Sequence, residues 1–479
     1  MSFDTLTFWL FFSLAWLFWR FLPFKIAKSV TIFMSLAFYG WWNPLYISLL
    51  LFCTLSNYIT GNQIHNQKRN SARNFWLIIS LLCNLGPLIF FKYSGFVAQS
   101  FADIFKRGWD IKYSFQNIVI PVGISFYTFQ AMTYTIDIYK RVLIPVNNVK
   151  DLFLYITFFP QLLAGPIVKA KIFLPQLSER NQLSMPTIQK GFYRIIWGLF
   201  MKIVIADNLA IFVNNVYNMS NLPTINPVSA WIGAIAFSIQ IFADFAGYSA
   251  VAIGLACLMG LTFHENFNYP YISSSLREFW TRWHITLSNW LRDYLYIPLG
   301  GNRKGEVRTV ANIIITMTIC GFWHGGSWTY IAWGGLHGLG LAVERFFSKQ
   351  KQFLTQDIFI ESQISLNEAV KKLLRVIATY LFFVITLVFF RAESFKMASI
   401  MLYKMFICIF TEPLIIPINS IQYIILIIPV FLLHAGQLLH EWFGVRKNSY
   451  MRAFSAAVMM VLLIIVSRKT ESIFIYFRF

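Results

Sequence analysis

Long apolar segments recur along the whole chain, and they constrain its fold more than any other feature. About eleven to thirteen segments can be counted, several of them near or above the roughly 18 residues typical of a membrane-crossing helix. The chain is 57% hydrophobic and only 13% charged, whereas about a quarter of the residues are charged in an average soluble domain. No alternating pattern of the kind found in membrane β-barrels occurs. The sequence therefore predicts an all-α polytopic membrane protein.

No polar domain interrupts the apolar segments, so residues 1–479 are expected to form a single integral membrane domain. The formal net charge of +20 fits basic loops that face anionic lipids, and it also fits recruitment of an anionic substrate. Nucleic acid is not expected as a partner, because no basic soluble domain is present. The five cysteines form no CxxC motif, which predicts packing roles without disulfides or a zinc site.

Basic loops predict how the chain is oriented in a membrane. The first apolar segment is followed by KIAK (25–28), and the third by HNQKRNSAR (65–73). Basic loops stay on the cytosolic side, so the N-terminus is expected on the opposite side. The first segment has no basic n-region and no small-residue cleavage site, which predicts a retained helix.

Two segments carry basic residues at both ends, which a helix that crosses once should not have. The first, LFLYITFFPQLLAGPIV (152–168), contains two prolines and a glycine, and we expect it to be re-entrant or broken. The second is a run of roughly 35 apolar residues, long enough for a short helical hairpin. It contains GFWHGGSW (321–328), whose glycines are expected to mark the break.

His324, in this second segment, is the strongest candidate for chemistry. Ionisable residues inside membrane segments are costly, and each is by default a candidate for a functional site. The imidazole titrates near neutrality, so His324 can accept and return a proton. The neighbouring glycines would let a substrate approach closely. The alternative is a neutral histidine that is bonded to the carbonyl of a neighbouring helix.

A second cluster of polar residues lies in SLREFWTRWHITLSNWLRDYLYIPLGGNRKG (275–305). We expect one amphipathic helix there, ended by Pro298 and the Gly300–Gly301 pair. At 100° per residue, five polar side chains share an arc of about 80°. They are Arg277, Thr281, His284, Ser288 and Arg292. The helix could lie flat in the cytosolic interface, or it could line a water-filled entrance where arginines meet phosphates.

Asp244 lies in another apolar run, FADFAGYSAVAIG. A buried carboxylate there needs a partner, such as an arginine, a histidine or helix N–H groups. A structural ion pair and an orienting role in catalysis are both open. His337 is expected to be a core histidine, although it could assist His324. No HExxH motif, GxSxG elbow or Walker loop occurs, so no metal site is expected and hydrolase and ATPase functions are disfavoured.

Taken together, these segments resemble the membrane-bound O-acyltransferase (MBOAT) family, specifically its bacterial alginate and peptidoglycan O-acetyltransferase branch. The resemblance rests on PVGISFYTFQAMTYTIDIYK, FFPQLLAGPIV, FADFAGYSAVAIG, REFWTRWHITLSNWLRDYLYIPLGGNRKG, GFWHGGSWTYIAWGGLHG and VFFRAESF. It implies a ring of tilted or broken helices around a central funnel. It also implies that His324 is the catalytic histidine and that His284 is the second important position. Arg277, Ser288, Arg292, Asp244 and Trp323 are then candidates for lining a donor or substrate channel.

The resemblance also implies a reaction. A short acyl group, acetyl in this branch, would move from a cytosolic thioester toward an exported cell-envelope polysaccharide, with His324 as general base. The co-substrate would be acetyl-CoA or an acylated carrier protein, and no cofactor would be bound. A periplasmic or membrane-tethered acetyltransferase would act as partner. The chain would lie among the lipids of the bacterial inner membrane, with its N-terminus in the periplasm.

Two other functions fit the same residues. A proton-coupled transporter or flippase could use the central cavity, with His324 as a proton relay. A membrane scaffold could instead recruit a separate transferase. No convincing inverted repeat is present to favour transport.

Overall fold

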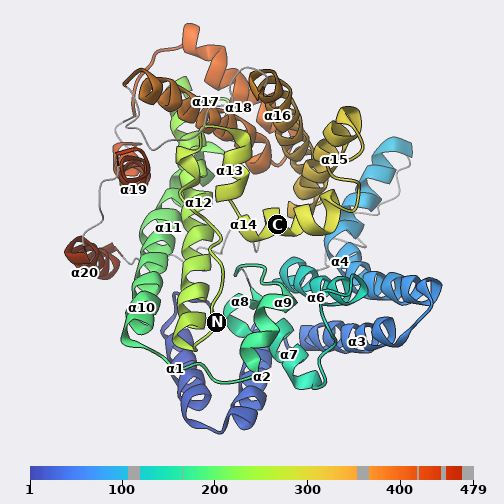
Figure 1. The fold of residues 1–479 in the computed structure, drawn as a ribbon. Coiled ribbons are helices and arrows are strands. Elements are labelled where there is room, and N and C mark those ends of the chain that lie inside the picture. Colours follow the sequence, from blue (N-terminus) through green and yellow to red (C-terminus); the bar gives the residue numbers. More distant parts are fainter. Residues whose placement is uncertain (106–118, 164, 353–365, 418–419, 444–448, 467–479) are drawn as a thin grey trace. The chain divides into compact units, whose positions relative to one another are not determined.

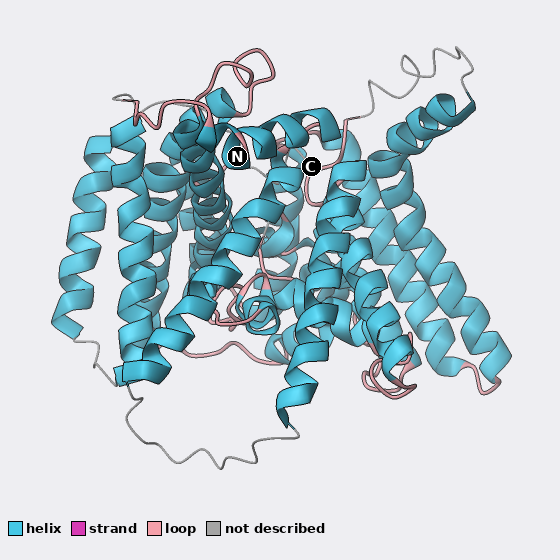
Figure 2. Cartoon of the chain, turned by 90° about the horizontal axis from the view of Figure 1, so that it is seen from above, coloured by secondary structure: helices cyan, strands magenta, loops and turns pink. Residues whose placement is uncertain are grey.

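The structure is a computed structural model, and it describes residues 1–105, 119–163, 165–352, 366–417, 420–443 and 449–466. Within these ranges the regular elements are all helical, and Figure 2 shows them joined by loops. Six of the described helices are long and apolar enough to cross a membrane: Pro44–Asn66, Asn70–Ala102, Met185–Val216, Pro227–Leu258, Asn367–Arg391 and Ile421–Trp442. The prediction of an all-α polytopic membrane protein is confirmed. The ring of helices around a funnel stays a prediction.

The chain divides into two compact units. The first comprises Met1–Leu199 and Tyr248–Glu265, and the second comprises Phe200–Gly247 and Asn266–Phe479. Helix α12 (Pro227–Leu258) contributes residues to both. The expectation of a single domain stays a prediction.

The first unit is built from helices α1 to α10 and the end of α12 (Figure 1). Their bounds are α1 Leu6–Phe21, α2 Phe24–Gly40, α3 Ile47–Asn66, α4 Asn70–Phe105, α6 Ile124–Tyr139, α7 Val149–Thr157, α8 Phe159–Leu162, α9 Ala170–Phe173 and α10 Met185–Leu199. Two 3-10 helices, Pro44–Tyr46 and Leu174–Leu177, lie between them. Helix α3 packs on both α4 and α6, and α2 packs on α7.

A buried polar network fixes the packing of α3, α4 and α6. Asn57 and Asn84 exchange two amide hydrogen bonds, each 3.0 Å long. The hydroxyl of Ser80 bonds to that of Thr135 at 2.8 Å. Because a polar group in an apolar interior must find a partner, these bonds specify which helix faces meet.

The segment 152–168 is broken, as its prolines and glycine predict. Helix α7 ends at Thr157, and Phe158 has non-helical dihedral angles (φ −55°, ψ 111°) before the single turn of α8. Residues 165–168 form no helix, and Ala164 lies outside the described residues. The break is therefore confirmed, while a re-entrant path in the membrane stays a prediction.

The second unit holds the remaining helices. Their bounds are α11 Asp207–Val216, α13 Leu276–Arg282, α14 Ile285–Leu291, α15 Glu306–His324, α16 Trp328–Gln352, α17 Leu366–Arg391, α18 Phe395–Phe406, α19 Ile421–Phe443 and α20 Ser449–Val466. Two π-helical stretches, Phe200–Ala206 and Arg292–Tyr296, and two 3-10 helices, Pro270–Ile272 and Cys408–Phe410, complete it.

Helices α15 and α16 form the predicted hairpin and pack tightly against each other (Figure 1). Gly325 ends α15, and α16 begins at Trp328. Gly321 does not mark the break, which corrects the prediction. It lies inside α15, where an added Cβ would collide with the carbonyl oxygen of Tyr330 and lie 3.0 Å from Gly334. Its small size therefore serves the crossing of two helices.

The prediction of one continuous helix from Ser275 to the stop at Pro298 is wrong. Helix α13 ends at Arg282, Trp283 is extended, and His284 has a left-handed backbone with a φ of 41°. The backbone on each side of His284 bonds to another loop: Asn268 N–H donates to the Arg282 carbonyl, and Ile285 N–H to the Asn266 carbonyl, both at 2.9 Å. These bonds replace the helical ladder, so the five polar side chains do not share one helical arc.

Candidate active site

His324 is the last residue of α15, and it is enclosed by aromatic rings. The rings of Trp323, Trp333 and Phe390 lie 4.9, 5.3 and 5.1 Å from the imidazole, measured between centroids. The histidine is only 3% exposed. Since the C-terminal end of a helix carries partial negative charge, this position stabilises the cation that forms when an imidazole accepts a proton.

His284 is also buried among aromatic side chains, with 1% of its surface exposed. The ring of Phe245, from α12, meets the imidazole edge-on at 4.6 Å, and Phe267 stacks at 6.3 Å. The left-handed backbone of His284 turns the chain sharply between α13 and α14. Histidine is among the few residues other than glycine that adopt this conformation with some frequency.

Trp323 joins the two histidines into one cluster. Its indole lies 4.9 Å from His324 and 6.1 Å from His284, measured between ring centroids. The structure therefore brings together three of the residues that the sequence singles out. Helix α15 supplies two of them, and the break between α13 and α14 supplies the third.

Asn266 determines which nitrogen of His284 carries the proton. The backbone N–H of Thr286 can only donate, and it points at the same Asn266 atom as His284 Nδ1, at 3.3 and 3.0 Å. That atom must therefore be the amide oxygen, and Nδ1 must be the protonated nitrogen. Burial lowers the pKa of His284 to about 3. The ring is thus neutral at neutral pH, with Nε2 as its acceptor atom.

His337 has the bonding expected of a core histidine. Its Nε2 lies 3.0 Å from the hydroxyl of Thr386, and the residue is fully buried. Trp333 lies between the two histidines of the α15–α16 hairpin, with its ring 5.3 Å from His324 and 4.9 Å from His337. His337 thereby extends the aromatic cluster to α17.

Asp244 has a lysine partner, whereas the sequence suggested an arginine, a histidine or helix N–H groups. Lys202 Nζ lies 2.9 Å from Asp244 and 2.7 Å from Asp207, and the three residues are buried. Lys202 belongs to a π-helical stretch, Phe200–Ala206. One lysine between two carboxylates ties α12 to the start of α11. The neighbour of Asp244 in the chain, Phe245, is one of the residues that pack on His284.

The three other candidates lie on or near the surface of α13, α14 and the turn that follows. Arg277 is exposed, and its backbone N–H bonds to Glu344. Arg292 is exposed and pairs with Asp293 at 2.8 Å. Ser288 is half-buried, and its hydroxyl donates to the Trp283 carbonyl at 3.3 Å.

Sequence reasoning missed two residues that shape the site. Lys202 carried a usable signal, because a lysine inside an apolar run needs a carboxylate partner. Asn266 carried none, because it lies in a short polar loop and reaches His284 only through the fold. In the part of the chain that the structure describes, no three His, Cys, Asp or Glu residues gather as metal ligands.

Known proteins resemble this chain over most of its length. The model of the membrane-bound O-acyltransferase family matches residues 139–385. A probable alginate O-acetylase, AlgI, of Pseudomonas aeruginosa is 38% identical over 385 residues, which are 80% of this chain and 70% of that protein. A peptidoglycan O-acetyltransferase of Helicobacter pylori is 34% identical, covering 78% of this chain and 72% of its own length. A teichoic acid D-alanyltransferase of Streptococcus thermophilus is 31% identical over 50% of this chain and 61% of its own length.

These matches confirm the resemblance read from the motifs. The family model covers slightly more than half of the chain and includes Asp244, His284, Trp323 and His324. The six long apolar helices make it a multi-pass membrane protein. The chain belongs to the membrane-bound O-acyltransferase family, and it is therefore an acyltransferase.

Proposed function

We propose that this chain is an O-acetyltransferase of the bacterial inner membrane. It moves acetyl from a cytosolic thioester toward an exported cell-envelope polysaccharide. The observation that carries the proposal is the contact of His324 and His284 with the same indole, Trp323, in a buried aromatic cluster. The alginate and peptidoglycan relatives support the choice of acetyl and of a polysaccharide. Acetyl-CoA is the proposed donor, and the D-alanyltransferase relative makes an acylated carrier protein the second candidate.

His324 is the proposed general base. It takes the proton of the acceptor hydroxyl while that oxygen attacks the thioester carbonyl, so a C–O bond forms, and the C–S bond then breaks. The imidazolium returns its proton to the leaving thiolate. Burial of the ring at the end of α15 supports this role, because electrostatic stabilisation is stronger away from water and hydrolysis is disfavoured there.

His284 is proposed to orient the acceptor. Its neutral tautomer, with Nδ1 bonded to Asn266, leaves Nε2 as a hydrogen-bond acceptor. An acceptor nitrogen suits a hydroxyl group, which donates, better than a developing oxyanion, which needs donors. An indole N–H, such as that of Trp323, is a donor of the kind that an oxyanion requires.

Other parts of the proposal concern the surroundings of the site. Arg277 and Arg292 are exposed and could meet the phosphates of the donor, while Ser288 is proposed to line its path. Asp244 is assigned a structural role on the strength of its pair with Lys202. The N-terminus is proposed to be periplasmic, and a periplasmic or membrane-tethered acetyltransferase would complete the transfer.

Purified chain in nanodiscs, supplied with acetyl-CoA labelled in the acetyl group, tests this proposal. An acetylated carrier protein is the parallel donor, and oligosaccharides of alginate and of peptidoglycan are the acceptors. The expected result is release of free thiol together with label in an ester of one acceptor, once the partner acetyltransferase that completes the transfer is supplied. The transporter alternative predicts flux of an intact substrate into liposomes with no thioester cleavage, and that outcome would contradict the proposal.

A further inference from the structure

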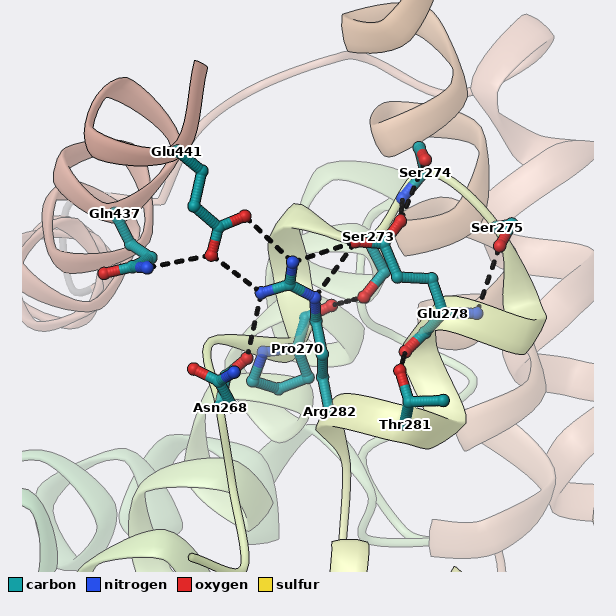
Figure 3. Close-up of polar contacts among 10 residues, drawn as sticks. All are labelled: Asn268, Pro270, Ser273, Ser274, Ser275, Glu278, Thr281, Arg282, Gln437 and Glu441. Atoms are coloured by element: carbon teal, nitrogen blue, oxygen red, sulfur yellow. Dashed lines mark hydrogen bonds and ion pairs between the residues drawn. The ribbon is translucent and has the colours of Figure 1, made fainter. Parts of the chain in front are cut away.

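Arg282 is the centre of a polar cluster just two residues before His284 (Figure 3). Its guanidinium donates to both carboxylate oxygens of Glu441, from α19, at 3.1 and 2.8 Å. Its Nε donates to Glu278 of α13 at 3.0 Å, and one Nη donates to the carbonyl of Asn268 at 3.4 Å. One side chain therefore joins α13, α19 and the loop that binds the backbone around His284.

The two carboxylates of this cluster are themselves held in place. Glu278 accepts bonds of 2.9 Å from both the N–H and the hydroxyl of Ser274, and Glu441 accepts one of 2.8 Å from Gln437. The Arg282 side chain is 14% exposed and that of Glu441 is 29% exposed. A forked guanidinium between fixed carboxylates has one preferred geometry, which a flexible lysine would not reproduce.

The polar cluster around Arg282 is connected to the backbone on both sides of His284. The Arg282 carbonyl accepts the N–H of Asn268, while Asn266 accepts both the N–H of Ile285 and the imidazole of His284. The loop 266–268 thus forms hydrogen bonds with the backbone before and after His284. Since a left-handed backbone is disfavoured for any residue with a Cβ, the surrounding contacts must hold His284 in it.

Helix α19 has a second contact with the same region. The ring of His434 stacks on Tyr271 at 5.0 Å and meets Phe242 at 5.1 Å and Tyr269 at 5.7 Å. Helix α19 therefore packs on the loop that follows Asn268 as well as on α13. Two independent contacts therefore fix the position of α19 against this region: the aromatic packing of His434 and the Arg282–Glu441 ion pair.

We propose that Arg282 is a positioning residue for His284 and that Glu441 of α19 anchors it. Removal of the anchor lets the turn between α13 and α14 relax, and the imidazole then leaves its place beside Trp323. Helix α19 lies beyond residue 385, where the match to the family model ends. The effect on turnover rests on the proposed function, whereas the effect on the position of His284 does not.

Glu441→Gln tests the proposal, because it keeps the side-chain size and removes the charge. The matched control is Glu306→Gln, which removes the same charge from the two-bond pair between Glu306 and Arg345, at 3.1 and 3.2 Å. The first measurement is the rate at which diethyl pyrocarbonate modifies His284 in the full chain, followed by mass spectrometry. His337, which is fully buried, is the internal reference.

The expected result is a several-fold faster modification of His284 in Glu441→Gln, with His337 and the Glu306→Gln control unchanged. Turnover should fall at least about tenfold with KM nearly constant, because misplacement of a catalytic group affects the chemical step. Arg282→Lys, which keeps the charge but loses the forked guanidinium, should show both effects as well.

Equal modification of His284 in Glu441→Gln and in Glu306→Gln would overturn the proposal. So would a parallel rise at His337, which would indicate general loosening, or unchanged turnover in an active enzyme. If the native chain transfers no acyl group, the proposed function fails. The modification rates still decide whether Arg282 and Glu441 hold His284 in position.

Discussion

The imidazole of His284 contacts the indole of Trp323, with ring centroids 6.1 Å apart. Trp323 immediately precedes His324 and contacts its ring as well, at 4.9 Å. The Trp323 side chain thereby connects the break between α13 and α14 to the C-terminal end of α15. The cluster is buried, so each histidine depends on its protein neighbours for proton and hydrogen-bond partners.

The first prediction concerns the dependence of stability on pH. Burial lowers the pKa of His284 to about 3, whereas in the unfolded chain it is about 6.5. Between these values the unfolded state binds the proton and the folded state does not. The contribution of the neutral His284 to the free energy of unfolding is therefore complete above the pKa of the unfolded chain. It is lost as the pH falls below that pKa, by about 1.4 kcal/mol per pH unit.

Chemical unfolding of His284→Gln in detergent, followed between about pH 4.5 and 7.5, checks this contribution. The variant should show a shallower loss of unfolding free energy on acidification than the native chain. His264→Gln, which removes an exposed histidine, should keep the native slope. Identical slopes of unfolding free energy against pH for all three proteins would contradict a difference in His284 protonation between the folded and unfolded states.

The second prediction concerns two adjacent glycines of α16. A Cβ at Gly334 would collide with the carbonyl oxygen of Met317, whereas a Cβ at Gly335 would have only Thr318 Oγ1 nearby, at 3.9 Å. Gly334→Ala should force α15 and α16 apart and destabilise the chain by about 1–3 kcal/mol. Gly335→Ala should be neutral or stabilising by up to about 1 kcal/mol, because alanine favours helix.

Urea unfolding and turnover of the two variants measure this difference. Turnover of Gly334→Ala should fall with its stability, since His324 lies at the end of the displaced helix. Equal behaviour of the two alanine variants would mean that the crossing of α15 and α16 is not as close as described.

The third prediction concerns the buried lysine. Lys202→Met removes the cation that Asp207 and Asp244 both contact, and loss of one member of a buried ion pair costs about 3–5 kcal/mol. Arg292→Met breaks a pair in which the arginine side chain is 58% exposed, and it should cost less than about 1 kcal/mol.

The fraction of folded protein during thermal unfolding in detergent, followed by tryptophan fluorescence, distinguishes these two outcomes. Lys202→Arg, which keeps the charge, should recover a large part of the stability. A Lys202→Met chain as stable as Arg292→Met would contradict a structural role for the lysine and its two carboxylates.

The helical class, the hairpin around His324 and the break within 152–168 were all predictable from the sequence. Each follows from local features: the length of an apolar run, the glycines near a turn, or prolines within a segment. The same reasoning placed His324 in a buried setting, because an ionisable residue in an apolar run is unusual.

The break at His284 was not predictable, because the residues around it show regular helical spacing. Backbone bonds from Asn266 and Asn268, which lie in a separate loop, overrule that spacing. The lysine partner of Asp244 likewise depends on which helices meet. Helical periodicity describes a single segment of the chain, so it cannot predict contacts between separate segments.

Exchange of His324 tests whether this histidine is the general base of the reaction. Native chain, His324→Gln and His264→Gln would be compared in nanodiscs with labelled acetyl-CoA, at matched size-exclusion profiles and melting temperatures. If His324 is the general base, its variant should lose acetyl transfer by about a hundredfold or more, while His264→Gln keeps the native rate. Native turnover in His324→Gln would show that His324 is not the general base.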